Sequence, residues 1–438
     1  NKLKDNFDLV IIGGGILGTS ISYFLSFLNE SKRIGVIEQE NNVAHHTSGR
    51  NTGKVHAPYL YNPEKKKLFA NAAFHGYEMW KQYSKQQNLP FKEDGVIEVA
   101  LDQKGIKVLE KYLKWGKQNG LQEKDIELIE KTELKKIEPE IKCEAALYAH
   151  RDGSTDYSTL TNAIMRDSKK NGINFLFNNK TNEIKKNKDK WEITINGNHK
   201  IYADFLINAA GGQAIDIAHN IGIAKNLTDV HFRGEYWKTP KKYHNLTKTS
   251  VYSVPEFPDY PFLDPHWIVR VDGSCEIGPN AVPVFSPYGY DAAENIKEFI
   301  PKVLEMINSG ARKIIFDKDF QELAFSEIQS SMSKSVMVER VKKFLPNINP
   351  KEITEKGTAG IRSSVIDENG KFVPDVILLE ENSSFHILNY NSPGATGALP
   401  FSVHLINQLH QKGLFENDDI NLQCGPWKFN EIVEKLEK

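Results

Sequence analysis

A strand–turn–helix–strand unit near the start of the chain constrains its fold more than any other feature. The apolar run Leu9–Ile12 enters the turn G-G-G-I-L-G at 13–18, helix-spaced apolar residues continue to Leu28, and a second apolar run at 34–37 ends in Glu38. A G-x-G-x-x-G turn between a strand and a helix, followed by an acid about 20 residues later, is typical of a dinucleotide-binding βαβ unit. The pattern therefore predicts an α/β fold that holds a dinucleotide.

Each part of this unit has a physical role. Gly13 permits the tight turn, Gly15 lets the backbone approach a pyrophosphate, and Gly18 lets the helix pack closely on the strand. The N-terminus of the helix offers free N–H groups and a partial positive charge to the phosphates. We expect Glu38 to accept hydrogen bonds from the adenosine ribose. The alternative interpretation is an ordinary glycine turn in an α/β sheet.

The overall composition excludes several other classes of protein. The 438 residues are enough for two domains, and 56 Lys+Arg against 57 Asp+Glu give a net charge of −1, which offers no support for nucleic-acid binding. No run approaches the ~18 apolar residues of a membrane-spanning helix, and residues 1–5 lead directly into the first strand without room for a signal peptide. Cys143, Cys275 and Cys424 lie too far apart for a zinc site or a disulfide framework. We therefore expect a cytoplasmic protein without a metal, and a peripheral contact with the inner face of the membrane stays open.

Glycine-rich turns that follow a strand and precede a helix recur along the chain. They occur at 13–18, at 205–212 and at 386–397, whereas aromatics, prolines and short extended runs dominate from 226 to 354. Separated segments that hold one long cofactor favour FAD over a nicotinamide, and a helix that begins at the C-terminal turn suits the pyrimidine end of a flavin. A plain connection between strand and helix is the alternative for that turn.

This distribution predicts a discontinuous Rossmann-like FAD-binding domain and an α+β substrate domain with a mixed or antiparallel sheet. The first would comprise 1–90, 148–222 and 355–438, and the second would comprise 91–147 and 223–354.

Local patterns predict several elements that the structure can test. Helices are expected over 64–85, 158–170, 292–307, 325–345 and 403–409, a charged helical region up to about 136, and a hairpin at Asn196-Gly197. Asp156 is expected to cap a helix. The stripe Phe429, Ile432, Val433 and Leu436 is expected to pack on the protein's own surface, with a membrane or redox partner as the alternative.

Five further strings of the sequence are distinctive. They are H-T-S-G-R-N-T-G-K-V-H-A-P-Y-L-Y-N-P at 46–63, F-R-G-E-Y at 232–236, P-F-L-D-P-H-W-I-V-R-V-D-G-S-C-E-I-G-P-N at 261–280, A-G-I-R-S-S-V-I-D-E-N-G-K-F-V-P-D at 359–375 and N-S-P-G-A-T-G at 391–397. From about 7 to 412 the chain resembles the D-amino-acid-oxidase-type FAD oxidoreductases, and among them the L-2-hydroxyglutarate oxidases and dehydrogenases.

The resemblance implies FAD-dependent oxidation of a 2-hydroxydicarboxylate, such as L-2-hydroxyglutarate, to the 2-oxo acid by hydride transfer to flavin N5. A malate:quinone oxidoreductase is the main alternative. An amine or amino-acid oxidase, or a non-catalytic or tRNA-modifying FAD protein, is favoured less. Oxygen, quinone and a protein carrier all stay open as electron acceptor.

The sequence also departs from the family pattern near the expected site. The family usually has His where Arg50 stands, an apolar residue at Lys54, glycine at Pro58 and Ala-Ala at 394–395. Lys54 and Pro58 flank His56, so these departures bear on the identity of the substrate.

The proposed oxidation needs a base for the hydroxyl proton, and histidine suits this role because its ordinary pKa lies near neutrality. We select His56, in the polar stretch after the second strand, with His266 as the alternative. Either histidine could instead be a neutral structural residue or could orient the substrate. Tyr252 and Asn391 are expected to donate hydrogen bonds near the substrate or flavin.

A dicarboxylate substrate also needs paired cations, and arginine binds carboxylates with two parallel hydrogen bonds. Arg270 and Arg362 are the first candidates, because a strand over 267–271 would place residues 266 and 270 on one face. Arg233 is the third. Each could instead be the buried partner of an acid, namely Glu235, Asp272 or Asp367.

The glycine turns and the resemblance together assign a set of residues to FAD. They are Gly13, Gly15, Ile16, Leu17, Gly18, Glu38, Gln39, His46, Thr47, Ser48, Asn51, Thr52, Gly53, Ala210, Gly211, Arg362, Pro393, Gly394, Ala395, Thr396 and Gly397.

Overall fold

The computed structural model describes residues 6–28, 32–256, 264–290, 295–296, 299–414 and 422–437. Parts of several sequence expectations lie outside these ranges: the segment 1–5, the start of the string at 261–280, and part of the helix expected over 292–307.

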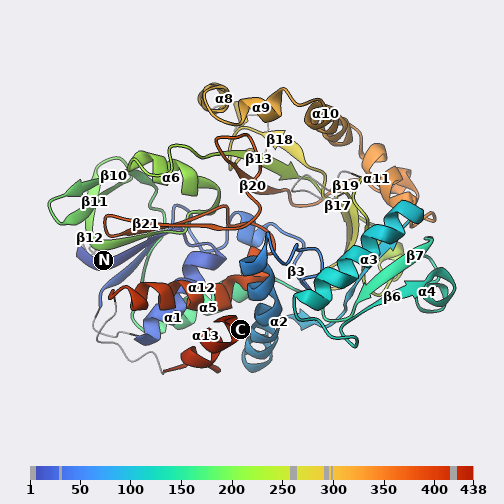
Figure 1. Ribbon diagram of the computed structural model, residues 1–438, viewed down its shortest axis with the longest axis horizontal. Helices are drawn as coiled ribbons and strands as arrows, with labels where there is room; N and C mark the ends of the chain where they lie inside the picture. Colours follow the sequence, from blue (N-terminus) through green and yellow to red (C-terminus); the bar gives the residue numbers. More distant parts are fainter. Residues whose placement is uncertain are drawn as a thin grey trace.

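A mixed sheet with five parallel neighbours forms the core of the first structural unit (Figure 1). Its strands are β1 (Asn6–Ile12), β2 (Ile34–Ile37), β9 (Asn174–Leu176), β10 (Thr181–Asn187), β11 (Lys190–Ile195), β12 (His199–Asn208), β21 (Ile377–Glu381) and β22 (Ser384–Leu388). β9, β2, β1, β12 and β22 are parallel neighbours, and β10 and β11 continue the sheet antiparallel from β12. The central strands are buried and apolar because helices and loops cover both faces. This topology confirms the predicted Rossmann-like arrangement.

Helices from distant parts of the chain cover this sheet. They are α1 (Ile16–Leu28), α2 (Lys67–Gln87), α5 (Tyr157–Lys170), α6 (Ala214–Asn220), α12 (Gly394–Gln411) and α13 (Phe429–Glu437). α12 packs on both α1 and α2, and α1 packs on α5. The three helices α1, α12 and α2 share one apolar core, so the N- and C-terminal segments of the chain fold as one unit.

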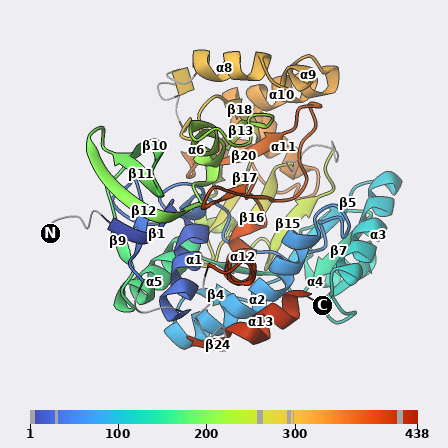
Figure 2. The same cartoon turned by 60° about the vertical axis from the view of Figure 1, so that its left-hand side comes forward.

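A second, mostly antiparallel sheet lies in the other half of the molecule (Figure 2). Its order is β19-β14-β17-β16-β15-β5-β7-β6. The strands are β5 (Val96–Ala100), β6 (Ile126–Glu130), β7 (Ala145–Ala149), β14 (Trp237–Lys238), β15 (Ser250–Ser253), β16 (His266–Val269), β17 (Cys275–Gly278) and β19 (Glu355–Lys356). The helices α3 (Gln103–Gln118), α4 (Lys131–Ile137) and α11 (Lys334–Lys342) pack against it.

Smaller sheets join the two halves. β13 (Thr228–Gly234) pairs with β18 (Val282–Val284) and β20 (Gly360–Ile366), while β8 (Gly153–Thr155) pairs with β3 (Lys54–Val55) and β4 (Phe91–Lys92). The remaining elements are the short 3-10 helices η1 (Thr47–Gly49), η2 (Gly211–Gln213), η3 (Lys241–Tyr243) and η4 (Pro350–Glu352), the helices α8 (Phe299–Ile307), α9 (Arg312–Ile315) and α10 (Lys318–Met332), and the strands β23 (Gln423–Cys424) and β24 (Trp427–Lys428). The division into two domains, with its boundaries, stays a prediction.

The structure confirms several local predictions and corrects others. Asn196 and Gly197 both have positive φ in the β11–β12 hairpin, and the Asp156 carboxylate accepts N–H hydrogen bonds at the start of α5. Phe429 and Ile432 are buried in the core of the first unit, so the C-terminal stripe packs on the protein itself. Within the described ranges, no helix is both long and apolar enough to span a bilayer.

Other helix predictions were wrong in extent. The stretch 325–345 is divided into α10 and α11, because the backbone is extended at Ser333 in a serine-rich segment with low helix propensity. The charged region before 137 contains strand β6, whose Ile126 and Ile129 are buried. α12 begins at Gly394, nine residues before the predicted start at 403, and continues through Pro400.

Candidate active site

The first glycine turn has the geometry that the motif predicts. Gly13 has a φ of +108°, and a Cβ there would lie 2.5 Å from the carbonyl oxygen of Ala209. A Cβ on Gly18 would lie 2.0 Å from the carbonyl oxygen of Gly13, so only glycine lets α1 approach β1 this closely. Around Gly15 the backbone is open except for the Ser48 hydroxyl, 3.1 Å from an added Cβ. The turn can therefore present its backbone to a phosphate group.

Side chains from neighbouring segments stabilise this turn. The Glu38 carboxylate accepts hydrogen bonds from the N–H groups of Gly14 and Glu40, both at 2.8 Å. The Ser48 hydroxyl accepts a hydrogen bond from the Ile16 N–H at 2.9 Å. Burial raises the pKa of Glu38, and these N–H donors oppose that rise. Glu38 is thus fixed at the end of β2, where the motif places the ribose contact.

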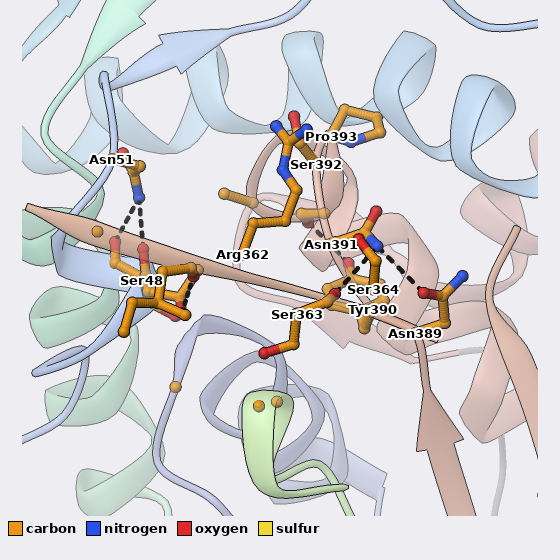
Figure 3. Close-up of a pocket in the computed structure, with 18 of the residues that line it drawn as sticks. Ser48, Asn51, Arg362, Ser363, Ser364, Asn389, Tyr390, Asn391, Ser392 and Pro393 are labelled. Carbon is orange, nitrogen blue, oxygen red and sulfur yellow. Dashed lines mark hydrogen bonds between the residues drawn. The ribbon is translucent and has the colours of Figure 1, made fainter. Parts of the chain in front are cut away.

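A large cavity begins at this turn and extends between the two halves of the molecule. Its volume is about 1030 Å³, at the upper end of the range for sites that hold a cofactor or drug-sized ligand. It is bordered by the segments 12–17, 37–39, 44–56, 209–213, 360–365 and 389–396. Figure 3 shows part of this lining, including Ser48, Arg362 and Asn391.

Most of the residues assigned to FAD line this cavity, although direct contact stays a prediction. They are Gly13, Gly15, Ile16, Leu17, Glu38, Gln39, His46, Thr47, Ser48, Asn51, Thr52, Ala210, Gly211, Arg362, Pro393, Gly394, Ala395 and Thr396.

Two assigned glycines have a different role. Gly53 lies outside the lining, has a φ of +73°, and a Cβ there would lie 2.3 Å from the Thr155 carbonyl oxygen. A Cβ on Gly397 would lie 2.8 Å from the Ala72 Cβ, at the contact between α12 and α2. Close backbone packing by itself accounts for glycine at both positions, and a contact with the cofactor stays a prediction. Gly18 also lies behind the lining, in the packing role that the motif predicts.

The C-terminal turn directs the start of α12 into the same cavity. The Asn391 amide donates to the Ser363 carbonyl oxygen at 3.4 Å and to the Asn389 side-chain oxygen at 3.2 Å (Figure 3). The Asn389 oxygen also accepts from the Val365 N–H at 3.0 Å. These bonds fix the turn to β20, so the positive end of the α12 dipole faces the cavity.

His56, His266 and Tyr252 meet in this cavity. The ring of His266 stacks on that of Tyr252, with centroids 3.9 Å apart. The backbone N–H of His56 donates to the Thr396 hydroxyl at 3.0 Å, which ties the histidine to α12. In the part of the chain that the structure describes, the buried Nδ1 of His266 has no hydrogen-bond partner.

Both imidazoles are neutral near pH 7. Burial lowers the pKa of His56 to about 3, with a further contribution from the charge of Lys54. Burial likewise lowers the pKa of His266 to about 3, and His56 adds to this effect. Each ring therefore keeps a lone pair that can accept a proton. Which of the two acts as the base stays a prediction.

Of the three predicted arginine anchors, only Arg362 lies in the cavity lining. Burial lowers its pKa below the ordinary value. Arg270 Nε donates to Glu276 at 2.8 Å and Nη1 donates to the Asn51 carbonyl oxygen at 2.9 Å. Arg233 is paired with Glu235, with Nη2 3.0 Å from the carboxylate. Both arginines are therefore paired with acids in this structure, and their role in substrate binding stays a prediction.

The position of Arg270 has a local cause. β16 ends at Val269, and the Arg270 carbonyl oxygen accepts a hydrogen bond from the Gly273 N–H at 2.9 Å. Arg270 is thus the first residue of a turn, and the strand alternation that would place it beside His266 does not reach it.

Lys54 and Lys66 line the cavity, and sequence analysis assigned neither to the site. Lys54 is fully buried, with its ammonium 3.0 Å from Asp152 and 3.3 Å from Asp94. In the sequence, the departure from the family pattern at Lys54 was the only indication that this lysine bears on the site. Lys66 stands in the run E-K-K-K at 64–67, where nothing in the sequence distinguishes it from its neighbours.

The lining suits FAD. The open backbone at Gly15, the two helix N-termini of α1 and α12, and a volume of about 1030 Å³ fit a long dinucleotide with a phosphate region at one end.

Comparison with known proteins supports this conclusion. The sequence model of the family described as FAD dependent oxidoreductase (DAO) matches residues 8–405. The mitochondrial L-2-hydroxyglutarate dehydrogenase of Bos taurus is 29% identical over 93% of this chain and 89% of its own length. The L-2-hydroxyglutarate dehydrogenase of Indibacter alkaliphilus is 29% identical over 90% of this chain and 96% of its own.

Solved structures share the fold. An FAD-bound L-α-glycerophosphate oxidase from Mycoplasma pneumoniae superposes with a TM-score of 0.72 at 20% identity, over 93% of this chain and 95% of that one. A glycine oxidase from Geobacillus kaustophilus has a TM-score of 0.68 at 14% identity, over 97% and 99% of the two chains.

Proposed function

We propose, from the premise that the chain belongs to the DAO family of FAD-dependent oxidoreductases, that it oxidises a 2-hydroxydicarboxylate to the 2-oxo acid and that its substrate is L-2-hydroxyglutarate. Proteins named L-2-hydroxyglutarate dehydrogenase align with this chain over 89% to 96% of their own length. The observation that carries the proposal is one cavity in which neutral His56 and His266, and the buried cation Arg362, lie with the first glycine turn.

Different residues of this cavity perform different parts of the reaction. Arg362 holds a carboxylate of the substrate in its planar fork, which fixes the orientation of the neighbouring hydroxyl group. His56, or His266, accepts the hydroxyl proton on a ring nitrogen. Bound FAD supplies the two-electron acceptor for the hydride that leaves the substrate carbon.

The depressed pKa values of the two histidines are consistent with this role. A group with a pKa of about 3 is a weak base in the free protein. An anionic substrate beside the imidazole favours the protonated form and raises its pKa toward the working pH. Tyr252, stacked on His266, keeps that ring in a fixed plane.

The test is reduction of the oxidised holoenzyme without oxygen. We expect L-2-hydroxyglutarate to bleach the visible flavin absorbance rapidly, and D-2-hydroxyglutarate, malate and amino acids to do so slowly or not at all. Bleaching by malate or an amino acid but not by L-2-hydroxyglutarate would overturn the proposed substrate. His56→Asn should retain FAD and lose reduction; a fully active His56→Asn would transfer the role of base to His266.

We also propose a quinone or oxygen as the electron acceptor. The reduced enzyme, mixed either with a soluble quinone under nitrogen or with aerated buffer, should be reoxidised at a rate proportional to the concentration of its true acceptor. If neither the quinone nor oxygen reoxidises the reduced enzyme, the electron acceptor is a protein carrier instead.

A further inference from the structure

The cavity contains a cation that neither the fold nor the ion pairs of the protein explain. Lys66 caps the N-terminus of α2 with its backbone, and its side chain lines the cavity and is largely withdrawn from solvent. Its ammonium group forms no hydrogen bond or ion pair with any residue in the described ranges. The nearest ring is that of Tyr61, whose centroid lies 5.7 Å from Nζ.

The other basic residues of the lining differ from Lys66. Lys54 is neutralised by Asp152 and Asp94, and the guanidinium of Arg50 stacks over Tyr290 at 4.0 Å. Lys65, Lys111 and Lys371 are exposed to solvent. Arg362, like Lys66, is partly exposed and lines the cavity.

Lys66 and Arg362 face the same part of the cavity. Figure 3 shows Arg362 extending from β20 toward Ser392 and Pro393. Tyr61, whose ring lies under the Lys66 ammonium, lines the cavity together with Ser392 and Arg362, and the charge of Arg362 acts on the Tyr61 hydroxyl. The charge of Arg362 also acts directly on Lys66. Two like charges therefore lie close together at the edge of one cavity, from α2 on one side and β20 on the other.

We propose that Lys66 is the second carboxylate anchor of the site: Arg362 binds one carboxylate of the substrate and Lys66 binds the other. The proposal rests on the proposed function and specifies how a dicarboxylate is distinguished from a monocarboxylate. Holding two like charges close together costs free energy, and a dianion between them offsets that cost. A substrate with a methyl group in place of the distal carboxylate would leave Lys66 without a partner.

The electrostatics of Lys66 give this anchor a pH dependence. Burial lowers the pKa of Lys66 to about 8, Arg362 lowers it further, and Asp375, on the loop after β20, opposes both. Lys66 is therefore charged at pH 7 and loses its charge as the pH rises above about 8 in the free enzyme. Affinity for a dicarboxylate should fall over that range, whereas affinity for a monocarboxylate should not.

The test compares Lys66→Met with wild type, with Lys66→Arg as the conservative variant and Lys67→Met as the control for an exposed neighbouring lysine. For Lys66→Met we expect a KM for L-2-hydroxyglutarate roughly 10- to 100-fold higher with little change in kcat, as for a lost charge-assisted hydrogen bond. The monocarboxylate L-2-hydroxyvalerate should be turned over equally by wild type and Lys66→Met. Lys66→Arg should recover most of the affinity.

Equilibrium binding of unreactive carboxylates tests the role of Lys66 independently of the identity of the substrate. Glutarate, which has no hydroxyl group to oxidise, should perturb the flavin spectrum of wild-type holoenzyme and raise its Tm, and Lys66→Met should weaken that binding 10-fold or more while valerate binding is unchanged. If L-2-hydroxyglutarate fails to reduce the flavin but glutarate binding depends on Lys66, the proposed substrate falls and the anchor stands. If Lys66→Met binds glutarate like wild type, or loses glutarate and valerate equally, Lys66 is not the anchor.

Discussion

Replacement of Asp152 by asparagine tests the buried charge cluster that supports His56. Lys54, with its side chain fully buried, lies 3.0 Å from Asp152 and 3.3 Å from Asp94, and it donates to the Gly95 carbonyl oxygen at 3.0 Å. The other Asp152 oxygen accepts the Ala57 N–H at 2.8 Å. The two carboxylates hold the pKa of Lys54 above its ordinary value despite burial. Asp152→Asn removes one of these negative charges and keeps the size and shape of the side chain.

The expected loss follows from the burial of the cluster. Removal of one partner of a buried ion pair costs about 3–5 kcal/mol, because it leaves an uncompensated charge. Asparagine retains an oxygen for the Ala57 N–H, and Asp94 still faces Lys54, so the lower end of that range applies. An unfolding entropy of about 2.1 cal/mol/K per residue gives the 438-residue chain roughly 0.9 kcal/mol/K if it unfolds as one unit. Tm should therefore fall by roughly 3 °C.

Thermal unfolding of the holoenzyme provides the assay. Asp94→Asn is the matched control, because the side chain of Asp94 is 11% exposed and that of Asp152 is 1% exposed. We expect the Asp94 variant to lose less stability. In the double variant Lys54→Met/Asp152→Asn, the uncompensated ammonium is absent and part of the loss should be recovered. An Asp152→Asn protein with an unchanged Tm, or a double variant whose losses simply add, would refute the reasoning.

Other consequences can be measured on the same protein. Gly18→Ala should weaken FAD retention during gel filtration, because its Cβ would lie 2.0 Å from the Gly13 carbonyl oxygen and α1 must shift. Acid should destabilise the fold through His56 and His266: their folded pKa values of about 3 lie below the ordinary 6.5, so the stabilisation is complete above pH 6.5 and declines as the pH falls toward 3. Each can contribute up to about 1.4 kcal/mol per pH unit, and urea titrations at pH 7 and 5 should show a smaller difference in His266→Asn than in wild type. Phe429→Ala should cost about 3–5 kcal/mol in urea unfolding without changing KM, because its side chain is 0% exposed in the core of the first unit, remote from catalysis.

The cofactor region could be predicted from the sequence because the glycine turns that line the cavity depend on backbone geometry within contiguous segments. The turn at 13–18 needs glycine at fixed positions, and the start of α12 is preceded by the turn at 391–393. Such constraints leave a local pattern that can be recognised without the fold. At Gly53 and Gly397 the pattern is ambiguous, because a glycine needed for close packing resembles a glycine needed for a ligand.

The carboxylate anchors could not be predicted in the same way. An arginine in a promising string either faces the cavity or pairs with an acid, and the outcome depends on tertiary neighbours. Arg270 pairs with Glu276 after the end of β16, whereas Arg362 lies within β20 and lines the cavity. Lys66 belongs to a helix start in the first unit and has no local signature.

The departure from the family pattern at Lys54 does not weaken the case for a dicarboxylate substrate. A lysine next to His56 would add a positive charge to the substrate site if it were free. Asp152 and Asp94 neutralise that charge in the cavity lining, and the same Asp152 holds the Ala57 N–H beside His56. The substitution therefore replaces apolar packing with an ionic support for β3. Arg362 and Lys66, which we propose as the carboxylate anchors, take no part in these ion pairs, so the substitution at Lys54 leaves the proposed recognition of a dicarboxylate unchanged.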